Sequence, residues 1–129
     1  MSRKWWYGSK WCWPATRWAI YFRDHLQCVW CGKPYGAETL DHLIPGDRGS
    51  KRPHHLVASC LECNSKRKSR SVRSWLAGRE DKAEVLERLG RRFDRLDRKN
   101  ALARKSLLLS GTEVEWNFAA MADKDDVPF

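Results

Sequence analysis

The chain lacks any long hydrophobic run. Its longest apolar stretch extends only from Trp18 to Phe22, far short of the roughly 20 residues that a membrane-spanning helix needs. The first residues are charged and then rich in tryptophan, so they show neither the apolar segment nor the cleavage site of a secretory signal. We therefore expect a cytoplasmic protein whose cysteines are reduced.

Acidic residues are too few to balance the basic ones. The 129 residues contain 16 Asp and Glu against 25 Lys and Arg, which gives a net charge of +9. A small basic protein most often binds a polyanion, so nucleic acid is the first expectation; the alternative is that the charge only keeps the protein soluble. The length fits one domain with an appended arm, and 42% hydrophobic residues allow a thin core.

The five cysteines do not form the framework of a disulfide-rich domain. Four of them form two C-x-x-C pairs, Cys28 with Cys31 and Cys60 with Cys63, while Cys12 stands apart. Two such pairs in a reduced protein indicate a structural zinc site, because each short turn can aim both sulfurs at one tetrahedral ion. The alternative is a set of redox-active or incidental pairs.

Hydrophobic spacing and turn residues predict several helices and two short strands. A single long charged helix is expected near the C-terminal end, with Gly90 weakening its middle. A flexible tail should follow it. The expected elements are a helix over 15–25, a cysteine knuckle over 28–36, strands over 38–44 and 55–59, helices over 60–70 and 71–78, the long helix over 81–109 with Val85, Leu86, Leu89, Phe93 and Leu96 as its apolar stripe, and the tail over 111–129.

The first 13 residues contain four tryptophans interspersed with basic residues. Such a segment could stack on bases and contact phosphates. It could equally cover the small core, which we prefer because indole rings bury a large area. The tryptophans are Trp5, Trp6, Trp11 and Trp13.

The stretch "LDHLIP" places Asp41 beside His42 within an apolar run. Adjacent side chains of a regular strand point to opposite faces. Both can reach one site only if the strand ends or bulges there, and Pro45 and Gly46 favour such an end. The alternative is a surface histidine beside a carboxylate with no chemical role.

Residues 28–68 resemble the HNH endonucleases, in the four-cysteine subtype found in phage and bacterial genomes. The matching pieces are "CVWCG", "LDHLIP", "HLVASC" and "CLECNSKRK". The resemblance implies a small α+β fold: a ββα-metal core with structural zinc, flanked here by an N-terminal helix and a long C-terminal helix. The resemblance covers about a third of the chain. We expect a nuclease domain over 1–78, with its core at 27–71, followed by a C-terminal helical extension over 79–110.

The same resemblance implies residue roles. His42 would be the general base that takes a proton from the attacking water, and its unperturbed pKa of about 6.5 suits that task. Asp41 and Asn64 would bind a second metal, Mg²⁺ or Mn²⁺, which takes oxygen ligands. The family has an asparagine where this chain has His55. His55 is thus a candidate catalytic residue that replaces the asparagine, adds a metal ligand or marks weakened activity.

Basic residues around the motif are expected to contact DNA phosphates without reading sequence. A solvated basic face is the alternative for each of them. The candidates are Arg48, Lys51 and Arg52 in the loop and Lys66, Arg67, Lys68 and Arg70 on the helix.

The sequence thus predicts a zinc-stapled HNH endonuclease that nicks or cleaves DNA. The main alternative is a non-catalytic zinc module that binds nucleic acid, which the histidine at position 55 favours. A third is an accessory protein whose C-terminal helix docks on a partner, such as a phage DNA-packaging or replication protein. Self-association through residues 85–107 is the simplest form of that third alternative.

Overall fold

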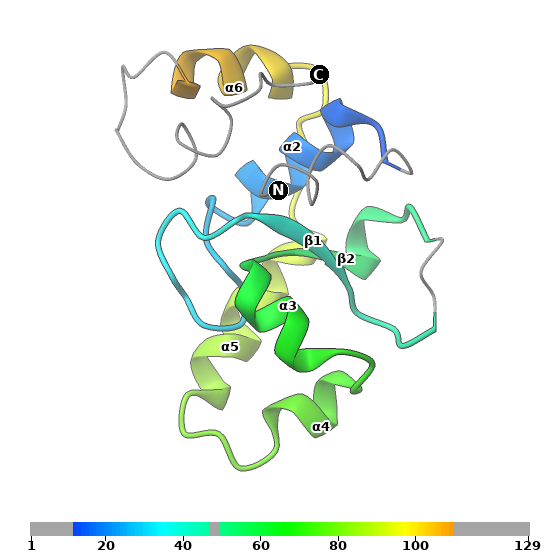
Figure 1. The fold of residues 1–129 in the computed structure, drawn as a ribbon. Coiled ribbons are helices and arrows are strands. Elements are labelled where there is room, and N and C mark those ends of the chain that lie inside the picture. Colours follow the sequence, from blue (N-terminus) through cyan, green and yellow to red (C-terminus); the bar gives the residue numbers. More distant parts are fainter. Residues whose placement is uncertain (1–11, 47–49, 110–129) are drawn as a thin grey trace.

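A two-stranded antiparallel sheet lies at the centre of the molecule, with helices on both of its sides (Figure 1). The computed structural model describes residues 12–46 and 50–109. The architecture is a small α+β fold, as the sequence predicted. Its elements are α2 (Pro14–Arg23), β1 (Thr39–His42), η1 (Pro53–His55), β2 (Leu56–Ser59), α3 (Leu61–Arg67), α4 (Val72–Leu76), α5 (Lys82–Leu89), η2 (Gly90–Phe93) and α6 (Ala101–Leu109).

The strand register decides which side chains share a face of the sheet. Leu40 pairs with Ala58 and His42 with Leu56, whereas Asp41 pairs with Val57. Because alternate residues of a strand face opposite sides, Leu40 and Asp41 belong to two different layers. All four residues of β2 are buried, so this small sheet is covered on both faces.

The first layer packs α2 and α6 against one face of the sheet. Pro14 stands in the first turn of α2, where its missing N–H costs nothing. Trp18 and Tyr21 of α2 are fully buried, and their rings meet edge to face with centroids 5.2 Å apart. Ala101 and Leu108 bring α6 into the same cluster. The N-terminal helix expected over 15–25 is therefore confirmed, ending at Arg23.

The second layer packs the cysteine knuckle and α5 against the other face. Trp30, which lies between the first two cysteines, is fully buried there with Val57. Val85 and Leu89 of α5 complete the cluster. The knuckle is thus part of a hydrophobic core.

The prediction of one long helix over 81–109 is wrong. The α-helix ends at Leu89, a short 3₁₀ turn follows over 90–93, and the chain is irregular until α6 begins at Ala101. Val85 and Leu89 are buried in the second layer but Ala101 is buried in the first. A straight helix cannot pack in both layers, so the α-helix ends at Leu89. Two members of the expected stripe, Leu86 and Phe93, are consequently exposed at 48% and 68%.

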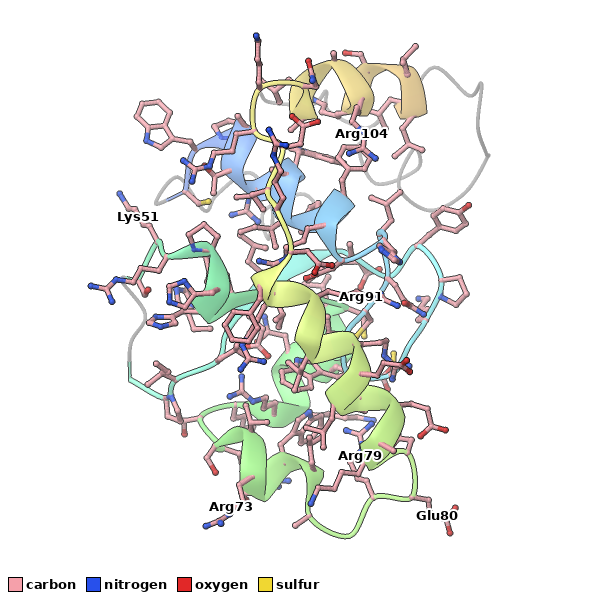
Figure 2. All side chains as sticks on the ribbon, turned by 180° about the vertical axis from the view of Figure 1, so that it is seen from behind. Lys51, Arg73, Arg79, Glu80, Arg91 and Arg104 are labelled. Atoms are coloured by element: carbon pink, nitrogen blue, oxygen red, sulfur yellow. The ribbon has the colours of Figure 1, made fainter. Side chains whose placement is uncertain are left out.

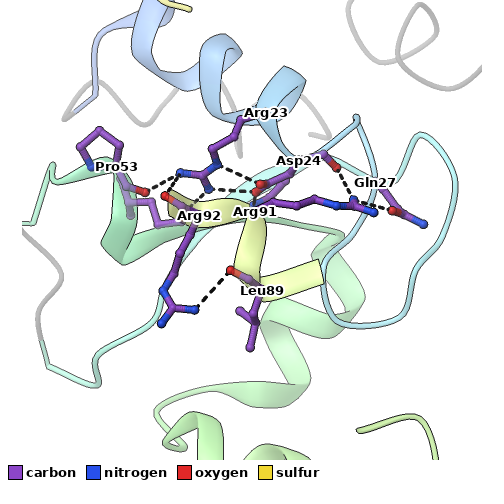
Figure 3. Close-up of polar contacts among 9 residues, drawn as sticks. Arg23, Asp24, Gln27, Pro53, Leu89, Arg91 and Arg92 are labelled. Carbon is purple, nitrogen blue, oxygen red and sulfur yellow. Dashed lines mark hydrogen bonds and ion pairs between the residues drawn. The ribbon is translucent and has the colours of Figure 1, made fainter. Parts of the chain in front are cut away.

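A buried arginine joins the end of α2 to three other segments (Figure 3). Arg23 donates to the carbonyl oxygens of Pro53 at 2.8 Å and Leu56 at 2.6 Å, and its guanidinium pairs with Asp24 at 2.9 Å. It also donates to the carbonyl of Arg92 at 3.4 Å. This one side chain therefore fixes η1, the start of β2 and η2 relative to one another.

Of the tryptophans in the N-terminal segment, only Trp13 lies within the described residues, and it is 76% exposed. That exposure does not support a packing role for this indole. Trp5, Trp6, Trp11 and the tail over 111–129 lie outside the described residues.

Candidate functional site

The four paired cysteines meet at one point between the knuckle and the start of α3. Their sulfur atoms all lie within 4.8 Å of one another, and the Sγ atoms of Cys31 and Cys60 are 3.9 Å apart. A tetrahedral zinc site with Zn–S bonds of about 2.3 Å puts sulfurs about 3.8 Å apart. The cluster could therefore hold a structural metal such as zinc, and Cys12 is buried elsewhere, in the α2 layer.

The four sulfurs shift one another's pKa values. Hydrogen bonds from Cys60 and Cys63 lower the pKa of Cys28. The bond to Cys28 raises the pKa of Cys60 to about 12, and bonds to Cys28 and Cys60 raise the pKa of Cys63. Sulfurs this close cannot all ionise by themselves, whereas a divalent metal would stabilise four thiolates together.

Two arginines brace the knuckle from the neighbouring helical segment. Arg79 donates to the carbonyl of Trp30 at 2.9 Å and Arg88 to the carbonyl of Val29 at 2.8 Å. The knuckle turns at Gly32, whose φ is +75°, and a Cβ there would lie 3.0 Å from the Arg88 guanidinium. The positive φ favours glycine at that position, and a side chain there would also crowd the Arg88 guanidinium.

An open hollow of about 800 Å³ lies where β1 ends beside α3. Asp41, His42 and Asn64, which the sequence assigned to one site, all line it. All three can line one hollow because the strand ends at His42 and the chain then turns through Pro45 and Gly46. Its other lining residues are Thr39, Leu40, Ile44, Pro45, Gly46, Ser65, Lys68 and Ser69.

Asp41 is 5% exposed, and both of its carboxylate oxygens are engaged. One accepts a hydrogen bond from the Trp30 indole at 2.8 Å, and the other accepts from Arg67 at 2.9 Å. Burial raises the pKa of the Asp41 carboxyl, while Arg67 and the indole act in the opposite direction. A metal at this carboxylate would have to share oxygens that already accept hydrogen bonds.

Arg67, which the sequence predicted to contact DNA, is buried. Its side chain is 1% exposed, because α3 turns it toward β1 instead of toward solvent. Besides pairing with Asp41, it donates to the carbonyl of His42 at 2.8 Å and of Leu43 at 2.7 Å, and its guanidinium stands 5.1 Å from the centroid of Trp30. Arg67 therefore holds the end of β1 from both sides of His42.

His42 is oriented by the backbone of the following loop. Its Nε2 lies 3.2 Å from the carbonyl oxygen of Ser50. A carbonyl can only accept, so Nε2 carries the proton in that contact and Nδ1 holds the lone pair in the neutral ring. The nitrogen that would act as a base is thus Nδ1.

The structure does not place His55 in the hollow with His42. The His55 ring lines a neighbouring hollow with His54 and Leu86, and its Nδ1 is 3.4 Å from the hydroxyl of Ser50. Its carbonyl accepts from the amide of Leu43 at 2.9 Å. His55 and His42 thus both contact Ser50, His55 at its hydroxyl and His42 at its carbonyl oxygen.

The remaining basic candidates differ in what surrounds them. Lys51 extends from the loop before η1 (Figure 2), and Arg52 beside it is also exposed. Lys68 lines the hollow, whereas Lys66 pairs with Glu62 at 2.9 Å on the outer face of α3. Arg70 is exposed, with its guanidinium 5.9 Å from the ring of Trp75, and Arg48 lies outside the described residues.

No family model, curated protein or solved structure matches the chain. Within the described ranges, each helix is too short or too polar to cross a lipid bilayer.

Sequence reasoning did not identify Trp30 and Ser50 as parts of this site. The indole of Trp30 and the backbone of Ser50 act through contacts that no spacing rule reveals. Arg67 did carry a signal, since it shares one side of α3 with Cys63 and Asn64 at helical spacing. That side faces β1, so its burial follows from the same pattern.

Proposed function

We propose that this chain is a metal-dependent endonuclease that hydrolyses DNA phosphodiester bonds with a ββα-metal core of the HNH kind. The observation that supports the proposal is that Asp41, His42 and Asn64 all line one open hollow. An imidazole, a carboxylate and an amide are the groups that such chemistry needs at one point. The tetracysteine cluster beside them supports the proposal, because it fastens the knuckle to α3, which carries Asn64.

The described residues fit a divalent ion only in part. Asn64 and Asp41 would supply its oxygen ligands, Asn64 from the open side of the hollow and Asp41 from its buried wall. When bound, Mg²⁺ or Mn²⁺ would supply charge neutralisation at the scissile phosphate and at the leaving oxygen.

The chain's own groups would perform three tasks. His42 takes the proton of the attacking water at Nδ1, because the Ser50 carbonyl holds the Nε2 proton. Lys68 lies in the same hollow and attracts the phosphate. Arg67 keeps the backbone on both sides of His42 in place while remaining away from the substrate.

A plasmid-nicking assay tests the proposal. Supercoiled DNA with Mg²⁺ or Mn²⁺ should be converted to the open circle by the zinc-loaded chain. His42→Ala should reduce the rate about 10²- to 10⁴-fold, the usual contribution of general acid–base catalysis, with zinc content and circular dichroism unchanged. His25→Ala is the matched control, since His25 is exposed and lines neither hollow. Equal rates for His42→Ala and the parent would remove the base from the mechanism.

A second candidate is a zinc-stapled module that binds nucleic acid without cutting it. Two observations favour it: Trp30 and Arg67 occupy both oxygens of Asp41, and His55 lies in a different hollow from His42. In that case the protein would shift DNA in a gel but leave the plasmid supercoiled with either metal at every protein concentration.

A further inference from the structure

A second hollow, of about 390 Å³, adjoins the first. Ile44 lines both, so they lie on either side of one residue. The volume lies within the range of small-ligand pockets, about 300–1,000 Å³. The proposed cleavage chemistry makes no use of this second hollow.

Exposed apolar side chains gather in this hollow. Phe93, Leu86 and Ile44 are exposed at 68%, 48% and 46%, and all three line it. Exposed large apolar groups are ordinary when scattered, but a group of them around one concavity marks a binding surface.

One arginine gives the rim of the hollow a positive charge. Arg92 lines the hollow, and its guanidinium lies 4.3 Å from the centroid of the Phe93 ring. His54 also lines it, but desolvation and the neighbouring His55 lower the pKa of His54, so the positive charge there is that of Arg92. Apolar side chains beside a positive charge match a ligand that combines an aromatic face with a negative group, as a nucleotide does.

One buried side chain, Arg23, connects two walls of the hollow. η1 provides one wall and η2 another, and the buried Arg23 donates to the carbonyls of Pro53 and Arg92 in those two elements (Figure 3). The ring of Phe93 thus faces solvent from a braced backbone. An exposed aromatic ring on such a backbone can stack on a base.

We propose that this hollow binds one unpaired nucleotide of a DNA strand whose neighbouring phosphate lies over His42. A paired base offers only its edges to a protein, whereas an unpaired base exposes its ring face to Phe93. The preferred substrate is therefore DNA with a bulged or single-stranded nucleotide beside the cut. This inference takes the identity of the polymer from the proposed function, but its test does not depend on cleavage.

The test measures binding by fluorescence anisotropy, with zinc-loaded His42→Ala protein and no added Mg²⁺ or Mn²⁺. The probes are a fully paired duplex, the same duplex with one extra unpaired nucleotide, and the single strand. The bulged duplex should bind about tenfold more tightly than the paired one, within the range that one base stacked on an aromatic ring provides. Phe93→Ala should abolish that difference and leave binding of the paired duplex unchanged, whereas Phe93→Tyr should keep it.

Leu107→Ala is the matched control, because Leu107 is an exposed apolar residue of α6 at 59% and lies outside the hollow. Equal affinity for bulged and paired duplex, or a preference that survives Phe93→Ala, would overturn the inference. So would self-association in light scattering that Phe93→Ala abolishes, since a second copy would then occupy the hollow. Preference for the bulge together with an inactive parent protein would refute the nuclease and leave the nucleotide site standing.

Discussion

Arg67 and Asp41 form a buried ion pair between α3 and β1. Their side chains are 1% and 6% exposed, and the paired atoms are 2.9 Å apart. Breaking such a pair costs more than the pair contributes, because the remaining charge stays in a poorly solvated place. Here the remaining carboxylate would also lie beside the proposed base.

Arg67→Met should therefore destabilise the fold by about 3–5 kcal/mol at neutral pH. The loss should shrink toward pH 5. Burial already raises the pKa of Asp41, and without the guanidinium it rises further, so at acid pH the variant regains a neutral carboxyl that is cheaper to bury. Urea unfolding of the parent protein and of Arg67→Met at pH 7 and at pH 5 measures the loss of unfolding free energy at each pH.

Lys66→Met is the control for this experiment. Lys66 is the neighbour of Arg67 in sequence, but its side chain is 64% exposed in a surface pair with Glu62. Exposed pairs of this kind contribute little to stability, because water and salt screen their charges. A similar loss of unfolding free energy in Lys66→Met and Arg67→Met would contradict the role of Arg67 in holding the end of β1. A loss in Arg67→Met that does not change with pH would contradict it as well.

The helices and strands near the cysteines were the easiest elements to predict from the sequence. Cys60 caps α3, and its sulfur accepts from the amide of Cys63 at 3.4 Å, so one spacing pattern encodes both the helix start and the metal ligands. The break after Leu89 was not predictable in the same way, because the apolar stripe continues through it. Only the positions of the two layers determine that Val85 and Ala101 pack on opposite sides of the sheet.

Removing one ligand tests whether the metal holds these elements together. Cys63→Ala should lower zinc content from one ion per chain to a small fraction and remove the cooperative thermal transition. A structural zinc contributes an apparent binding free energy on the order of 10 kcal/mol or more, which a core this thin cannot replace. Zinc analysis after gel filtration and a thermal melt are the measurements.

Cys12→Ala serves as the matched variant for the zinc experiment. Cys12 is buried, but in the α2 layer, apart from the four clustered sulfurs. Its removal should leave the zinc content at one ion. Retention of full zinc by Cys63→Ala, or its loss in Cys12→Ala, would show that the cluster is not the metal site.

At the scale of the whole molecule, the net charge of +9 can be read directly from the sequence. The sequence does not reveal which of the basic side chains are exposed and can contact a polyanion. Arg67 and Arg23 are turned inward and bond to backbone carbonyls, whereas Lys68 stays at the open hollow. Charge counting predicts that a polyanion binds, and only the packing of α3 shows which side chains can reach it.

Binding of a short duplex should weaken as salt rises, and Lys68→Ala should reduce the slope of log K against log salt by about 0.9 if Lys68 neutralises one phosphate. Anisotropy titrations at four salt concentrations in the His42→Ala background give that slope. Arg104→Ala is the comparison, since Arg104 lies over the ring of Phe22 in the α2 layer at 4.0 Å from its centroid. A larger change of slope for Arg104→Ala would place the DNA on the opposite side of the sheet.

The pairing of α2 with α6 has a consequence for synthesis on the ribosome. The buried face of α2 includes Trp18, and its cover includes Ala101 and Leu108, which are translated some eighty residues later. The indole of Trp18 in α2 therefore stays uncovered by α6 until α6 has left the exit tunnel of the ribosome. Nascent chains stalled before residue 100 should be more readily captured by chaperones and digested by protease than chains released after α6.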